Sequence, residues 1–307
     1  MARMTLLDIA KANGCDKVVG LIDETTKAYP EVRDGQARTI KGINFKTLIR
    51  TALPTVGYRN ANEGTAATKG TYANRLVECF IMNPRIEADK AVADAYEDGA
   101  QAWLALEGEG VLQAAFGTLA KQFYYGATTA GGDSKGGPGL IDSLDTTNMV
   151  VDAGGTTADT CSSVWAVKYG GTYVQWVYGL NGQLMLSDPR EETIYDTNNN
   201  PLDGYVQSML ARPGVQCGNR TCVGRIKKLT ADSGKGLTDA LIGSLLAKFP
   251  AGIVPDVLLM TKRSQEQLRA SRTATNATGA PAPIPTDAFG IPIGVTDGIL
   301  NTEALTL

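Results

Sequence analysis

Residues 83–123 read NPRIEADKAVADAYEDGAQAWLALEGEGVLQAAFGTLAKQF, and this stretch decides the predicted fold. Asn83 is a favourable N-cap, and Pro84 stands at the first helical position, where its missing N–H costs no hydrogen bond. Apolar side chains recur at helical spacing, at positions 92, 96, 100, 103, 111, 115 and 119. One helix over this stretch would be roughly 60 Å long at about 1.5 Å per residue. We therefore predict one long helix.

Glycines interrupt the predicted helix. Each costs about 1 kcal/mol relative to alanine in a helix interior, so we expect a bend near Gly108–Gly110. The alternative is that the same stretch forms two ordinary core helices.

The segment before this stretch, residues 36–83, predicts a long β-hairpin. Apolar or β-branched residues alternate with other residues from Ile43 to Leu53, and a second strand runs from Tyr72 to Met82. The connection between them, Gly57–Thr71, is small, polar and rich in turn residues, which indicates a flexible tip. A lone two-stranded hairpin is marginally stable in water, so this hairpin needs another surface to lie on.

The charges of these two segments are opposite. Residues 36–83 carry seven basic and two acidic side chains, a net charge of +5, whereas residues 84–123 carry three basic and seven acidic ones, a net charge of −4. A hairpin that leaves the start of the helix cannot easily fold back along it. We hypothesise that the hairpin of one copy lies on the helix of a neighbouring copy. The contact candidates are Arg50, Arg59, Lys69 and Arg75 on the hairpin, and Glu97, Asp98, Glu107 and Glu109 on the helix. The alternative is two solvated faces of one monomer.

The remaining sequence indicates a mixed α/β region. Strands are expected at 162–169 and 172–180, joined as a hairpin by Gly170–Gly171, and then within 215–229, at 256–261 and around 291–295. Helices are expected over 237–249, capped by Thr238, and over 264–272. The polar segment 187–204 is expected to be a loop or a further hairpin.

Composition argues against most kinds of catalytic site. The 307-residue chain contains no histidine, which removes Ser-His and Cys-His nucleophile pairs and histidine metal sites. Its five cysteines are scattered, and Cys217 and Cys222 lack the further ligands that zinc needs. No apolar run is long enough to predict a membrane span, and a net charge of −3 does not favour nucleic-acid binding by the whole chain. We therefore predict no catalytic residue, no metal, no cofactor, no enzyme activity and no membrane partner.

Four segments resemble the major capsid proteins of tailed bacteriophages, which have the Hong Kong 97-type fold. The segments are ARTIKGINFKTLIRTALPTVGYRNANEGT (37–65), RLVECFIMNPRIEADKAVADAYEDG (75–99), SSVWAVKYGG (162–171) and FGIPIGVTDGILNTEAL (289–305). The resemblance covers nearly the whole chain. It implies an α+β fold and a structural function, in which copies assemble as hexamers and pentamers into an icosahedral head that encloses double-stranded DNA.

The resemblance also implies a division of the chain. Residues 1–35 would be an N-terminal arm, and residues 36–83 would be the extended loop that reaches over an adjacent subunit. Residues 84–160 would form the peripheral domain with the spine helix. Residues 161–307 would form mainly the axial domain, with late segments free to return to the peripheral domain. The polar loop 187–204 is one candidate for contacts at the centres of hexamers and pentamers.

The partners implied by the resemblance are other proteins of a virion. They are many copies of the chain itself, a separate scaffolding protein (because the N-terminal arm is short), a portal protein and, as an optional addition, a decoration protein. Packaged DNA would be enclosed without sequence-specific contacts, and assembly would take place in the cytoplasm of the host bacterium.

Two other functions are compatible with parts of the sequence. An encapsulin-like shell around a cargo enzyme would use the same fold. A β-rich carbohydrate-binding protein or enzyme would use Trp165, Trp176 and nearby aromatic side chains as a sugar platform, together with adjacent acidic residues.

Overall fold

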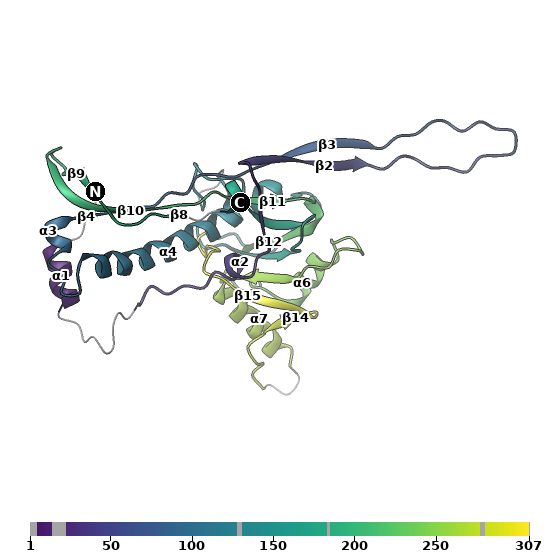
Figure 1. The fold of residues 1–307 in the computed structure, drawn as a ribbon. Helices are drawn as coiled ribbons and strands as arrows, with labels where there is room; N and C mark the ends of the chain where they lie inside the picture. Colours follow the sequence, from purple (N-terminus) through teal and green to yellow (C-terminus); the bar gives the residue numbers. More distant parts are fainter. Residues whose placement is uncertain (1–4, 14–22, 128–130, 183–184, 277–279, 307) are drawn as a thin grey trace.

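The structure is a computed structural model that describes residues 5–13, 23–127, 131–182, 185–276 and 280–306. A long helix and a narrow sheet extend to one side of a mixed α/β body, and a long hairpin projects from the opposite side (Figure 1). This arrangement is the α+β fold expected from the sequence. Within the described residues, no helix is both long enough and apolar enough to cross a membrane.

The spine helix is α4, Ala100–Tyr125. Its 26 residues give it a length of about 39 Å, shorter than predicted. The helix is continuous through Gly108 and Gly110, so neither glycine divides it into two. Its second half enters the core, where Phe123 stacks on Trp176 with ring centroids 5.2 Å apart.

The start predicted for this helix is wrong. The chain instead forms strand β4, Arg85–Asp89, and then the short helix α3, Lys90–Ala93, which the Asp89 side chain caps by accepting from Ala91 N at 3.0 Å. Charged residues alternate with Ile86 and Ala88 here, which is strand periodicity. Residues 85–89 therefore form backbone hydrogen bonds with β10 instead of a helix. Asn83 and Pro84 precede β4 and cap no helix.

The narrow sheet beside α4 is built on β10, Pro201–Leu210. It pairs antiparallel with β4, β8 (Met185–Leu186) and β9 (Arg190–Tyr195). The polar segment 187–204 thus forms much of a β9–β10 hairpin, one of the two forms expected for it. The hairpin lies beside β4 and α3, away from the α/β body (Figure 1). This placement sets the hairpin apart from the body that contains the six-stranded sheet.

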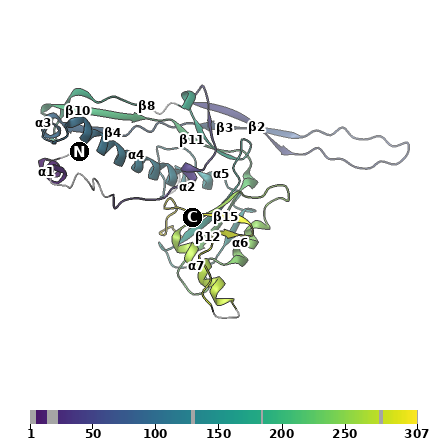
Figure 2. The same ribbon diagram turned by 60° about the horizontal axis from the view of Figure 1, so that its bottom comes forward.

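The α/β body contains a six-stranded sheet in the order β14-β15-β13-β6-β12-β5. The strands are Asp287–Ala288, Ile291–Val295, Val257–Met260, Ser162–Val167, Val223–Leu229 and Val150–Asp152. Helices α6, Asp239–Leu246, and α7, Lys262–Ala274, belong to this body (Figure 2). The predicted cap is confirmed, because Thr238 Oγ1 accepts from Leu241 N at 3.3 Å. The short helix α5, Leu140–Ser143, packs near the end of α4.

The hairpin predicted at Gly170–Gly171 is wrong. Strand β6 belongs to the six-stranded sheet, whereas β7, Val174–Tyr178, lies between β1 (Ala37–Thr39) and β11 (Pro213–Cys217) in a separate three-stranded sheet. Gly170 has a positive φ of 149° at the point where the chain passes from one sheet to the other. The two glycines therefore mark a crossing between sheets. Two short 3₁₀ turns, Leu180–Gly182 and Arg220–Cys222, follow β7 and β11.

The two N-terminal helices contact α3 and α4. Helix α1, Leu6–Asn13, contacts α3 at one end of the molecule, where Asn13 Nδ2 donates to Ala95 O at 3.0 Å. Helix α2, Pro30–Arg33, packs on α4 nearer the body. Its Glu31 side chain is buried and accepts from Thr296 Oγ1 at 2.8 Å.

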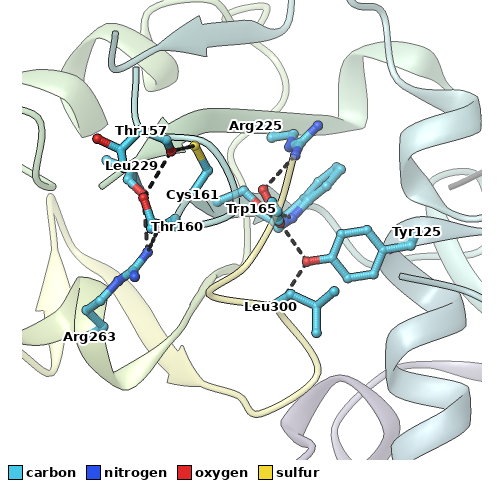
Figure 3. A network of polar contacts seen from close by, with 11 residues as sticks. Tyr125, Thr157, Thr160, Cys161, Trp165, Arg225, Leu229, Arg263 and Leu300 are labelled. Carbon is cyan, nitrogen blue, oxygen red and sulfur yellow. Dashed lines mark hydrogen bonds and ion pairs between the residues drawn. The ribbon is translucent and has the colours of Figure 1, made fainter. Parts of the chain in front are cut away.

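A buried polar network joins the C-terminal segment to the core (Figure 3). Arg225 Nη2 and Glu303 Oε2 are 2.9 Å apart, and their side chains are 3% and 1% exposed. Tyr125 and Ser163 each donate a hydroxyl hydrogen bond to Glu303 Oε1 at 2.6 Å, and Trp165 Nε1 donates to Ser163 Oγ at 3.0 Å. The end of α4, strand β6 and the C-terminal segment are thereby held together.

Candidate assembly surface

The predicted hairpin is present, with strands β2, Asn44–Ala52, and β3, Thr71–Glu78. The two strands pair antiparallel from Asn44 opposite Glu78 to Ala52 opposite Thr71. Only the base packs on the body, where Val77 and Phe45 meet Ile40 and Val177. Beyond this base the hairpin extends away from the rest of the chain (Figures 1 and 2).

One face of the hairpin includes the residues that pack against the body at the base. We call the opposite face the outer face. Phe45, Thr47 and Ile49 are half-buried, and they alternate along β2 with exposed side chains. The register places exposed residues of both strands opposite one another on one face. This outer face consists of Asn44, Lys46, Leu48, Arg50, Tyr72, Asn74, Leu76 and Glu78. It therefore mixes basic charge with apolar surface.

The hairpin tip also presents apolar side chains to solvent. Val56 is 92% exposed, Tyr58 is fully exposed, and Leu53 is exposed beside them. Sequence reasoning selected the charged residues of the hairpin and missed these apolar ones. The available signal was that a two-stranded hairpin has no second layer to cover its apolar residues.

The four basic candidates differ in their surroundings. Arg50 lies 5.5 Å over the Tyr72 ring, and both residues are on the outer face. Arg59 donates to Glu63 O at 2.6 Å within the tip, and Lys69 is an exposed tip residue. Arg75 is different, because its Nη1 donates to Cys217 O at 2.6 Å in its own chain. We therefore reassign Arg75 from an inter-subunit contact to an anchor of the hairpin base.

The acidic candidates lie toward the other end of the molecule. Glu97 and Asp98 are exposed in the turn before α4, and Glu107 and Glu109 lie in the first half of α4. Most of the negative charge counted from the sequence is outside the helix. Helix α4 itself has two acidic residues and one lysine, a net charge of −1. The description of an acidic helix is therefore wrong, although an acidic end around α3 and the start of α4 remains.

The two sets of candidates are not brought together within one chain. The hairpin tip and the end with α3 lie on opposite sides of the body in both views (Figures 1 and 2). A contact between these surfaces consequently requires two copies.

The tryptophan and cysteine candidates considered from the sequence lie inside the protein. Trp165 and Trp176 are buried, so they cannot present a platform to a sugar. Cys217 and Cys222 are buried next to each other, and the described residues contain no cluster of three or more metal-ligating side chains of the histidine, cysteine or carboxylate type.

Comparison with known structures places the fold among those of phage capsids. The structure is similar to a chain of bacteriophage Epsilon15, with a TM-score of 0.76 and 19% identity over 99% of this chain and 97% of that chain. It is also similar to the capsid of bacteriophage JBD30, with a TM-score of 0.57 and 10% identity over 96% of this chain and 98% of that chain. The fold is thus the Hong Kong 97-type capsid fold.

Comparison with protein families identifies the chain more closely. The model of the family described as major capsid protein GP7 matches residues 14–306, and the chain belongs to this family. No curated protein matches the chain. The protein is a structural component of an icosahedral bacteriophage head, a shell built from many copies of the chain.

Proposed function

We propose that copies of this chain join into hexamers and pentamers when the hairpin of each copy lies on its neighbour. The observation that carries this proposal is the outer face of the hairpin, where Leu48, Tyr72 and Leu76 are exposed beside Lys46 and Arg50. An isolated hairpin gains little stability in water, and burial of these side chains on another copy would stabilise it.

The surface proposed to receive the hairpin is the acidic end of the neighbour. Glu97, Asp98, Glu107 and Glu109 would face Arg50, Arg59 and Lys69 across the contact. Opposite charges at the rim of an interface contribute mainly to its register and rate of formation, whereas the apolar side chains supply most of the affinity.

The domain division follows from this arrangement. Residues 1–35 act as the arm, 36–83 as the extended loop, 84–160 with the β9–β10 hairpin as the peripheral domain, and the body containing β6, β12, β13, α6 and α7 as the axial domain. The β4–β10 ladder supports the assignment of 190–210 to the peripheral domain, although these residues follow 161 in the chain.

The further partners belong to the proposed assembly in the host cytoplasm. A scaffolding protein would set the curvature of the shell, a portal protein would occupy one vertex, and a decoration protein would reinforce the finished head. Double-stranded DNA would be enclosed without sequence-specific contacts. Membership of a phage capsid family supports this function over an encapsulin-like compartment.

The experiment is a charge reversal followed by rescue. Arg50→Glu on the outer face is expected to reduce shell formation at least tenfold, measured by sedimentation and electron microscopy of the purified full chain, with its scaffold where assembly needs one. Lys248→Glu makes the same charge change at an exposed residue just after α6 and serves as the matched control.

Rescue distinguishes a direct contact from a folding defect. A second reversal in the acidic end, tested as Glu97→Lys, Glu107→Lys or Glu109→Lys, should restore part of the lost assembly in the Arg50→Glu background. Equal assembly by Arg50→Glu and the unchanged protein would show that the outer face does not join subunits.

A further inference from the structure

The turn after β11 contains two buried thiols in contact. Cys217 ends β11 and Cys222 ends the 3₁₀ turn Arg220–Cys222, and their Sγ atoms are 3.9 Å apart. The two residues are 4% and 0% exposed. Both are free cysteines in this structure. Formation of a disulfide requires the sulfurs to approach by about 2 Å, to the bonded distance of about 2.05 Å.

We propose that Cys217 and Cys222 are a redox pair that closes to an intramolecular disulfide once the protein leaves a reducing compartment. The bond would lock the turn that holds the base of the hairpin. This inference concerns the chemistry of one chain, so it is independent of how the hairpin contacts a neighbour.

The surroundings favour reaction at Cys217. The contact with the Cys222 sulfur and the positive charge of Arg75 lower the pKa of the Cys217 thiol, against the opposing effect of burial. The same contact and burial raise the pKa of Cys222. Cys217 is therefore the attacking thiolate, and Cys222 is the thiol that completes the disulfide.

The turn keeps hydrogen bonds that hold its backbone when the disulfide forms. Cys222 Sγ donates to Asn219 O at 2.7 Å, a hydrogen bond that oxidation would remove. That carbonyl keeps a partner, because the backbone N–H of Cys222 also donates to it at 3.3 Å. The Asn219 side chain independently holds the turn by accepting from Thr221 N at 3.0 Å.

The reaction needs a small oxidant because neither thiol is exposed. The oxidant proposed is dissolved dioxygen outside the cell. The two thiols lose two protons and two electrons, one sulfur–sulfur bond forms, and dioxygen takes up both protons and both electrons to become hydrogen peroxide. In a reducing cytosol the thiols remain reduced.

The structural consequence lies at the hairpin base. Arg75 Nη1 donates to Cys217 O at 2.6 Å and reaches Gly218 O at 3.4 Å, and both acceptors are in the turn that the disulfide would close. Restricting this turn would hold both acceptors in place for Arg75. The disulfide would thus secure the hairpin after assembly without altering the hairpin itself.

The test is a peptide map of the assembled full-length protein. Particles kept under reductant and particles held in oxygen-saturated buffer are quenched with acid, denatured, alkylated and digested with trypsin without reduction. Arg220 lies between the two cysteines, so trypsin separates them into peptides 191–220 and 221–225 unless a disulfide joins them. The oxidised protein should give the joined pair and take up three alkyl groups, against five for the reduced protein.

Two variants supply the controls. Cys222→Ser should abolish the joined peptides, whereas Cys161→Ser, at another buried thiol, should leave them unchanged. Oxidation should also raise the thermal midpoint by about 4 °C in the unchanged protein and not in Cys222→Ser. Continued alkylation of Cys217 and Cys222 after oxidation would overturn the proposal, and so would a bond from either one to a different cysteine or another chain.

Discussion

Arg225 and Glu303 form an ion pair inside the protein core, with Nη2 and Oε2 2.9 Å apart and both side chains almost inaccessible to solvent. Arg225 is in strand β12 and Glu303 is in the C-terminal segment, so the pair joins these two parts of the chain. Glu303 also accepts a hydrogen bond from Tyr125 at the end of α4 (Figure 3). If one member of a buried ion pair is removed, the other charge is left unpaired in a low-dielectric interior. The loss of either member therefore destabilises the fold.

The first prediction concerns a variant that lacks one member of this pair. Glu303→Ala should lower the free energy of unfolding by about 3–5 kcal/mol, because it leaves the Arg225 guanidinium without its buried counter-ion. Denaturant unfolding of the unassembled protein measures the change. Glu266→Ala breaks the more exposed Glu266–Arg269 pair and should cost less than about 1 kcal/mol. Similar losses in the two variants would contradict the importance given to the core pair.

The second prediction concerns pH and the buried Glu31. The pKa of this carboxyl is raised from 4.5 to about 7, mainly by burial and to a smaller extent by the charge of Asp297, against the opposing effect of hydrogen bonds such as that from Thr296. Between these pH values the unfolded chain loses the proton while the folded protein keeps it, so stability falls as pH rises from 4.5 to about 7. The full loss above pH 7 is about 3 kcal/mol.

Glu31→Gln tests this dependence because glutamine resembles the protonated acid. The variant should be more stable than the unchanged protein at pH 8, and the difference should disappear on acidification to about pH 4.5. Thermal midpoints across this range provide the measurement, with Glu109→Gln on exposed α4 surface as the control. A Glu31→Gln protein that is less stable at pH 8 would show that the ionised carboxylate is favoured there.

The third prediction separates the anchor of the hairpin from its outer face. Arg75→Ala removes charged hydrogen bonds to the turn at Cys217 and should destabilise the unassembled protein by about 1.5–3 kcal/mol. Arg50→Ala should change that stability by less than about 0.5 kcal/mol, since Arg50 is an exposed surface residue. Paired unfolding and assembly assays should show a stability defect for Arg75→Ala and an assembly defect alone for Arg50→Ala. The reverse pattern would refute both assignments.

The fourth prediction uses the glycines of α4. A methyl group at Gly108 would meet no atom within 4 Å, so Gly108→Ala should stabilise the unassembled protein by about 1 kcal/mol. At Gly117 the new carbon would lie 2.7 Å from the Tyr29 hydroxyl oxygen, and Gly117→Ala should be destabilising. Denaturation midpoints that move in the same direction for both variants would count against this packing of the arm on α4.

Local patterns predicted several elements well. The alternation around Phe45 and Ile49 predicted β2, and Thr238 marked the start of α6, because both signals depend on neighbours within a few residues. The sequence also indicated that the hairpin needs a surface to lie on, and its outer face is exposed in this chain.

Other features depended on contacts between distant segments. The alternation of Ile86 and Ala88 was overlooked within a helical pattern, and only the pairing with β10 makes it a strand. Arg75 was chosen as an inter-subunit contact from its charge, and its carbonyl partner at Cys217 lies 142 residues away, where local patterns give no signal. Sequence spacing could not show that β6 and β7 belong to different sheets.

The most direct test of the account is an electron cryomicroscopy map of the assembled shell. In the shell, the outer face of the hairpin, including Leu48 and Arg50, is expected to be buried against the adjacent copy, near the end that carries Glu97 and Glu107. A shell in which this face contacts only solvent or its own chain would contradict the proposed mode of assembly.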